Sequence, residues 1–115
     1  MIQVMDILPS ELCKIVPPLN SQEGVTDPMV YMRFLTDSGW TWYVTEGSQE
    51  DDDFIFFGFV IGLEEEWGNF SLYELTEVRD LFGRPVGRDL DFKPERFSQI
   101  IAREHRLNGC TEGIN

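Results

Sequence analysis

The chain has 115 residues, enough to bury one hydrophobic core, and we expect a single domain over 1–115 with 1–28 and 107–115 at its periphery. Hydrophobic residues make up 42% and aromatic residues 13% of the sequence, which excludes wholesale disorder. The formal net charge of -12 disfavours direct binding to nucleic acid or to an anionic membrane, since like charges repel.

Three runs rich in β-branched and aromatic residues predict an antiparallel meander with strands at 29–36, 39–46 and 54–62. The turn before the second run contains Gly39, which can adopt the positive φ that closes a short hairpin. The third run is apolar on both faces, as is typical of a central strand that is covered on both sides. Gly58 lies within it, and we expect the side chain of a bulky neighbour to fill the gap there.

Two later segments predict helices that cover this sheet. Ser71 and Glu74 have capping-box spacing before an apolar stripe with helical periodicity, which predicts a helix over 72–82. A proline at a plausible first position and a second apolar stripe predict another helix over 94–106.

Two shorter elements complete the predicted α+β fold. A short N-terminal helix is expected near Pro9, and 86–92 could add a brief edge strand. The fold class is therefore an antiparallel meander sheet of three to four strands packed against helices.

The two cysteines bear on the compartment and on metal binding. Cys13 and Cys110 lie near opposite ends of the chain and have no C-x-x-C partner, which argues against a structural zinc site. The sequence has no secretory leader pattern and no apolar run long enough to span a bilayer. We therefore expect a cytoplasmic protein with two free thiols.

Four blocks of the sequence carry a family resemblance. They are W-T-W-Y-V-T-E at 40–46, F-G at 57–58, G-N-F-S-L-Y-E-L at 68–75, and G-R-P-V-G-R-D-L-D-F-K-P at 83–94. Over roughly 29–94 the chain resembles the bacterial family known as domain of unknown function 2958. The resemblance implies a small protein of a plasmid or another mobile element, and it implies no activity, cofactor or catalytic residue. The acidic runs are heavier than the family pattern, so inferences from them concern this sequence.

Nucleophilic catalysis has little support in the sequence. His105 is the only histidine, and its charged surroundings favour a solvated helix end over a general base. The sequence has no nucleophile elbow, P-loop or dinucleotide fingerprint. We predict no catalytic residue and no cofactor.

Clustered carboxylates raise the alternative of a magnesium-dependent enzyme. Asp51, Asp52 and Asp53 precede the third predicted strand, and Glu64, Glu65 and Glu66 follow it. Oxygen ligands of this kind suit Mg²⁺ or Ca²⁺, but the two clusters would lie about 25 Å apart at the ends of the strand. Solvated acidic loops are therefore the preferred interpretation, and we predict no metal site.

The charge distribution favours protein binding. Residues 37–80 contain twelve acidic side chains and a single basic one, Arg79, and such a field speeds encounter with basic partners. Rows of carboxylates spaced roughly 5–7 Å apart can imitate the phosphates of duplex DNA. Trp67, between glutamates and a glycine, is a candidate interface anchor.

We therefore hypothesise a small acidic protein that binds a basic nucleic-acid-handling protein as a DNA mimic, in the manner of an anti-restriction or anti-CRISPR inhibitor. The alternatives are the magnesium-dependent enzyme and an accessory interaction domain without inhibitory action. The hypothesis requires the acidic side chains to share one surface. The residues expected to contact the partner are Glu46, Glu50, Asp51, Asp52, Asp53, Glu64, Glu65, Glu66, Trp67, Glu74 and Glu77.

Overall fold

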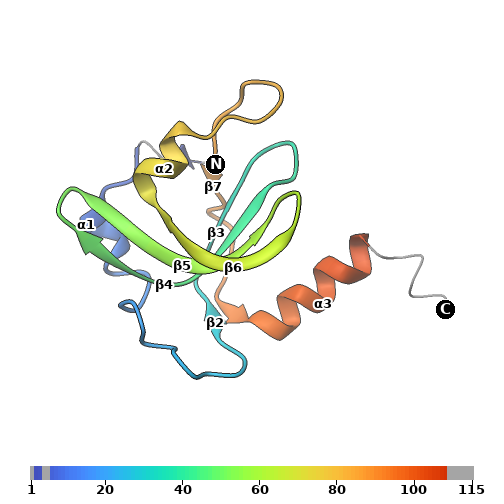
Figure 1. The fold of residues 1–115 in the computed structure, drawn as a ribbon, viewed down its shortest axis with the longest axis horizontal. Helices are drawn as coiled ribbons and strands as arrows, with labels where there is room; N and C mark the ends of the chain where they lie inside the picture. Colours follow the sequence, from blue (N-terminus) through green and yellow to red (C-terminus); the bar gives the residue numbers. More distant parts are fainter. Residues whose placement is uncertain (1, 4–5, 109–115) are drawn as a thin grey trace.

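An antiparallel sheet forms the centre of the fold (Figure 1). The computed structural model describes residues 2–3 and 6–108. The strand order in the sheet is β1-β7-β3-β4-β5-β6, and a separate pair joins β2 to β8. The strands are β1 Ile2–Gln3, β2 Met29–Val30, β3 Met32–Leu35, β4 Thr41–Glu50, β5 Asp53–Ile61, β6 Glu65–Ser71, β7 Gly87–Arg88 and β8 Glu95–Arg96. The predicted α+β class is confirmed.

The predicted meander corresponds to β3, β4 and β5, with changes at both ends. The predicted strand 29–36 is divided at Tyr31, because β2 leaves the large sheet to pair with β8. Strand β4 continues beyond the predicted residue 46 to Glu50, so β4 and β5 form one long hairpin. Within 86–92, strand pairing is confined to β7. Gly39 has φ 105°, as the predicted turn requires.

Strand β6 was not predicted, because its glutamates indicated an acidic loop. β6 pairs with β5 over its whole length and forms one edge of the sheet. Glu65 and Glu66 are exposed there. Charged side chains are common on edge strands, where they oppose pairing with other chains, so an acidic sequence is compatible with a strand at this position.

The three helices are α1 Pro9–Leu12, α2 Leu72–Glu77 and α3 Phe97–Asn108. The predicted capping box is confirmed: Ser71 Oγ accepts from Glu74 N at 3.0 Å, and Ser71 N donates to Glu74 Oε1 at 2.9 Å. Helix α2 ends at Glu77 rather than at 82, because Val78 is already extended. Helix α3 begins at Phe97 rather than at 94, because β8 occupies the preceding residues.

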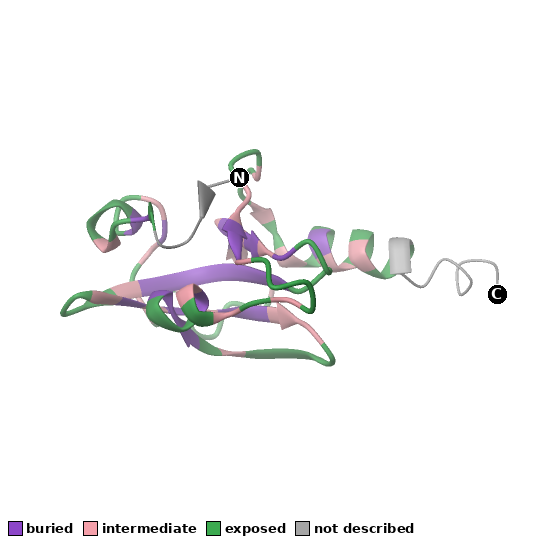
Figure 2. Ribbon diagram, turned by 90° about the horizontal axis from the view of Figure 1, so that it is seen from above, coloured by how far each residue is buried: buried purple, intermediate pink, exposed green. Residues whose placement is uncertain are grey.

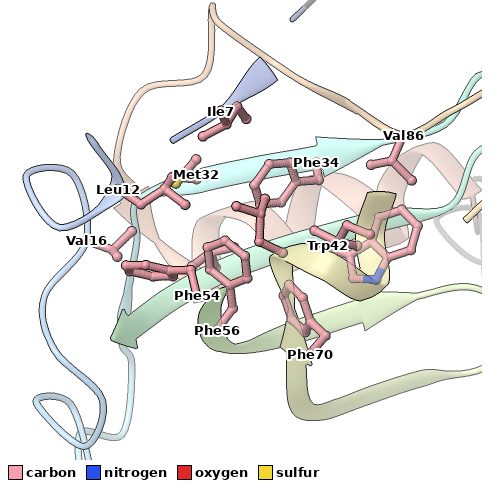
Figure 3. Packing of buried hydrophobic residues seen from close by; sticks show 13 residues of the cluster. Ile7, Leu12, Val16, Met32, Phe34, Trp42, Phe54, Phe56, Phe70 and Val86 are labelled. Carbon is pink, nitrogen blue, oxygen red and sulfur yellow. The ribbon is translucent and has the colours of Figure 1, made fainter. Parts of the chain in front are cut away.

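Apolar side chains pack on both faces of the sheet. Leu12, Leu72 and Leu75 bring α1 and α2 into the larger cluster, while Ile100 brings α3 into a smaller one on the opposite face. Figure 2 shows that burial is concentrated in the middle of the long strands and that the tips of the hairpins are exposed. The members of the larger cluster labelled in Figure 3 are Ile7, Leu12, Val16, Met32, Phe34, Trp42, Phe54, Phe56, Phe70 and Val86.

The gap at Gly58 is closed by backbone, not by the bulky side chain that we predicted. A Cβ at Gly58 would lie 1.9 Å from the carbonyl oxygen of Tyr43, next to a register shift between Val44 and Glu46. The β-bulge brings the two strands together here, which only a residue without a side chain permits.

Candidate functional site

Six of the predicted contact residues lie at the end of the β4–β5 hairpin and on the adjacent helix α2. We call this group the acidic end; its members are Glu50, Asp51, Asp52, Asp53, Glu74 and Glu77. Glu50 and Asp53 are the last paired residues of the hairpin, and Asp51 in its turn has φ 55°. Five of the six side chains are exposed, and that of Asp53 is partly buried.

Asp53 attaches α2 to the hairpin. Its Oδ1 accepts hydrogen bonds from Phe54 N at 2.7 Å and from Tyr73 N at 3.0 Å. Tyr73 lies in the first turn of α2, so this carboxylate links the strand to the free N–H groups at the beginning of the helix. The contact attaches the first turn of α2 to the hairpin.

The second predicted cluster lies at the other end of β5. Glu64, Glu65 and Glu66 occupy the β5–β6 turn and the beginning of β6, about 25 Å from the acidic end at the usual rise of a strand. Glu65 Oε1 lies 3.2 Å from His105 Nε2. Glu65 and Glu66 point to opposite faces because successive side chains on a strand alternate. The structure therefore does not join the two acidic clusters into one continuous surface.

Glu46 has a different environment from the other predicted contact residues. It is buried, with 6% of its surface exposed, and its carboxylate accepts from Asn20 N at 2.6 Å and from Gln22 N at 2.9 Å. These bonds attach the segment 19–28 to the sheet. Glu46 is therefore not part of the exposed acidic end, since its carboxylate binds the protein's own backbone.

Trp67 lies beside a cavity rather than among the exposed glutamates. The centroid of its ring lies 5.8 Å from that of Phe57, with 14° between the ring planes, and 4.7 Å from that of Phe97. Of the surface of Trp67, 40% is exposed. The cavity, which we call the β6 cavity, has a volume of about 410 Å³. The segment 19–28 forms one side, and side chains of the three long strands form the other: Thr45, Glu46, Phe57, Trp67 and Asn69.

A second cavity, of about 380 Å³, contains a network of charged side chains that the sequence analysis did not anticipate. Arg33 is paired with Asp89, Arg103 is paired with Glu95, and the Tyr43 hydroxyl donates to Glu104. Burial, together with the hydrogen bond to Glu104, raises the pKa of Tyr43 to about 12. No single segment carried a signal for this network, because its members come from distant parts of the chain.

The sequence model described as Protein of unknown function (DUF2958) matches residues 13–110. The chain belongs to the DUF2958 family. No curated protein and no solved structure matches it. The match extends beyond 29–94, the region in which the resemblance is recognisable by its motifs.

Three of the four motif blocks of this DUF2958 protein meet at the β6 cavity. Glu46 comes from the first block, Phe57 from the second, and Asn69 from the third, and all three line it. The fourth block contributes Asp89 and Phe92 to the second cavity. The first three blocks are therefore adjacent in space although they are separated in the sequence.

The described part of the DUF2958 chain contains no cluster of metal ligands. Within residues 2–3 and 6–108, no three His, Cys, Asp or Glu side chains are grouped so that they could hold a metal ion. Cys13 is a free, exposed thiol, and Cys110 lies outside the described residues. His105 is exposed on α3, where the sequence analysis placed a solvated helix end. Across the same described residues, no helix is long and apolar enough to cross a membrane.

Proposed function

We propose a narrower function than the sequence suggested, because the acidic residues do not share one surface. In this proposal the protein is a binding protein whose acidic end alone contacts a basic surface on a protein that handles nucleic acid. The observation that supports the proposal is the hydrogen bond from Tyr73 N to Asp53, which attaches the helix that bears Glu74 and Glu77 to the acidic hairpin. These groups occupy the surface of a protein with a net charge of -12. A surface of this kind attracts a cationic cleft over long range.

The geometry of the acidic end supports imitation of a nucleic acid. Neighbouring positions on strands and helix turns place carboxylates roughly 5–7 Å apart, a spacing comparable to that of phosphates along a duplex. The proposed action is to occupy a DNA-binding cleft and so inhibit its owner. A restriction enzyme or a CRISPR effector is the proposed target class, in line with a mobile-element origin.

A pair of matched triple variants tests this function. The variant E50Q/D51N/D52N removes three charges from the acidic end, and asparagine tolerates the left-handed conformation of Asp51. The control E64Q/E65Q/E66Q removes the same charge from the opposite end of β5. Both variants keep Asp53, whose carboxylate links the hairpin to α2.

The measurement is inhibition of DNA cleavage by purified restriction enzymes and CRISPR effectors, at low and at high salt. We expect the wild-type protein and the control to inhibit at least one member of the panel, and the acidic-end variant to lose about tenfold or more in potency. Equal losses in both variants would show that only net charge matters. The proposal would be refuted if the protein neither inhibits DNA cleavage by any enzyme of the panel nor competes with DNA for binding to it.

Binding without inhibition would instead support the accessory-domain alternative. That outcome is recognised by a complex that forms at low salt, weakens in the acidic-end variant, and leaves DNA cleavage unchanged. The magnesium-dependent enzyme is tested separately by calorimetric titration with MgCl₂, for which it predicts saturable binding at micromolar concentrations.

A further inference from the structure

The β6 cavity has a lining suited to a positively charged guest. Two acidic residues line it: Glu46 from inside the sheet and Glu23 from the exposed segment opposite. None of the described residues that line the cavity is basic. Its volume of about 410 Å³ lies within the range typical of small-molecule sites.

Glu46 is the most informative member of this lining. Its side chain is more than nine-tenths buried. Among the described residues, no basic side chain forms an ion pair with Glu46. Buried carboxylates are normally paired with a cation, because removing a charge from water is costly. Each carboxylate oxygen accepts one backbone hydrogen bond and can accept another. Glu46 can therefore also bind a cationic donor.

Aromatic rings provide the second feature of the site. Phe57 and Trp67 line the cavity and pack nearly parallel to each other, so the cavity is bordered by π systems as well as by carboxylates. Aromatic rings attract ammonium and guanidinium groups through their quadrupole, most strongly where water is excluded. The amide of Asn69 adds a polar group at the same edge of the sheet.

We propose that the β6 cavity is a binding site for an organic cation, a guanidinium or alkylammonium group, held by Glu46 and by the rings of Phe57 and Trp67. The same chemistry has two sources: an arginine or lysine side chain of another protein, or a free polyamine. The proposal does not depend on the acidic end, whose residues do not line this cavity.

The test uses three probes with the full chain: N-acetyl-arginine amide, its neutral isostere N-acetyl-citrulline amide, and spermidine. Binding is followed by NMR shifts of the backbone amides of Asn20, Gln22 and Asn69. We expect saturable shifts with the arginine probe at millimolar concentration, and affinity for the citrulline probe that is weaker by about tenfold or more. Tighter binding of spermidine would assign the site to a free polyamine, and tighter binding of the arginine probe would assign it to a protein side chain.

Three single variants locate the cation. Trp67→Leu removes an indole ring from the lining and should weaken binding by about fivefold. Glu23→Gln removes a charge at the exposed side of the cavity, so it should weaken binding without affecting folding. Glu66→Gln removes the same charge from the opposite face of β6 and should leave binding unchanged.

Three results would overturn the proposal. The first is equal affinity for the arginine and citrulline probes, and the second is the lack of a saturable shift with any cationic probe. The third is an equal effect of Glu23→Gln and Glu66→Gln, which would indicate general attraction to an acidic protein. If Trp67→Leu does not fold, the comparison of these two glutamine variants decides the question alone.

Discussion

The carboxylate of Glu46 accepts a hydrogen bond of 2.9 Å from the backbone N–H of Gln22. The side-chain amide of Gln22 donates in return to the carbonyl of Thr45, the neighbour of Glu46, at 2.8 Å. A further bond to the carboxylate comes from the N–H of Asn20, whose φ of 74° turns the chain toward the sheet. This reciprocal contact attaches the segment 19–28 to β4 and forms one side of the β6 cavity.

Removal of the Glu46 carboxylate is expected to destabilise the fold. Glu46→Ala leaves the N–H groups of Asn20 and Gln22 without an acceptor, so the free energy of unfolding should fall by about 2–3 kcal/mol. Urea denaturation measures this change. The control is Glu50→Ala, at the exposed end of the same strand, which should change stability by no more than about 0.5 kcal/mol. Equal effects would contradict a structural role for Glu46.

The paired glycines of β5 and β6 are expected to differ sharply in their tolerance of a methyl group. Gly58 and Gly68 are register partners, but a Cβ at Gly58 would meet Tyr43 O at 1.9 Å, whereas a Cβ at Gly68 would meet nothing within 4 Å. Gly58→Ala should therefore cost about 3 kcal/mol or prevent folding, because the backbone of β4 would have to move. Gly68→Ala should be close to neutral. Thermal unfolding of both variants tests this, and a tolerated Gly58→Ala would contradict the tight bulge.

Leu75 and Leu81 both lie in the helix predicted over 72–82, but they have opposite environments. Leu75 is 1% exposed in the core, and Leu81 is 95% exposed beyond the end of α2. Leu75→Ala should lower the free energy of unfolding by about 2–5 kcal/mol through the lost burial and the cavity that it leaves. Leu81→Ala should have an effect within about 0.5 kcal/mol. Chemical denaturation of the two variants measures these changes. A large effect of Leu81→Ala would support the longer helix predicted over 72–82.

Stability is expected to fall at alkaline pH because of Tyr43. Its pKa is raised from 10.0 to about 12 in the folded protein, first by burial and then by the hydrogen bond to Glu104. The folded state then holds a proton that the unfolded state has lost, so stability is fully present below pH 10 and falls as pH rises toward 12. The loss should amount to roughly 2–3 kcal/mol.

Tyr43→Phe provides the control for this pH dependence. Denaturation at a series of pH values should show a smaller alkaline loss in the variant. Ultraviolet titration of the folded wild-type protein should show a late phenolate transition that the variant lacks. A wild-type curve identical to that of Tyr43→Phe would contradict the raised pKa.

Features set by neighbouring residues were predictable from the sequence. The capping box at Ser71 and Glu74 and the turn at Gly39 depend on residues at most a few positions apart, and the structure contains both. The end of α2 was not predictable in this way. Val78 and Leu81 have helical spacing, but the chain leaves the helix at Val78 and closes a loop through a bridge between Arg79 and Pro85.

The amount of acidic charge and the meander are properties of the sequence itself, since composition and local alternation determine them. The tertiary structure decided which carboxylates lie together and which are buried. Glu46 and Glu50 occupy the same strand, yet one binds the segment 19–28 and the other faces solvent. That difference arises from packing between segments far apart in the chain. Local patterns carry no information about such packing, because the free energy that fixes it comes from contacts formed only in the folded protein.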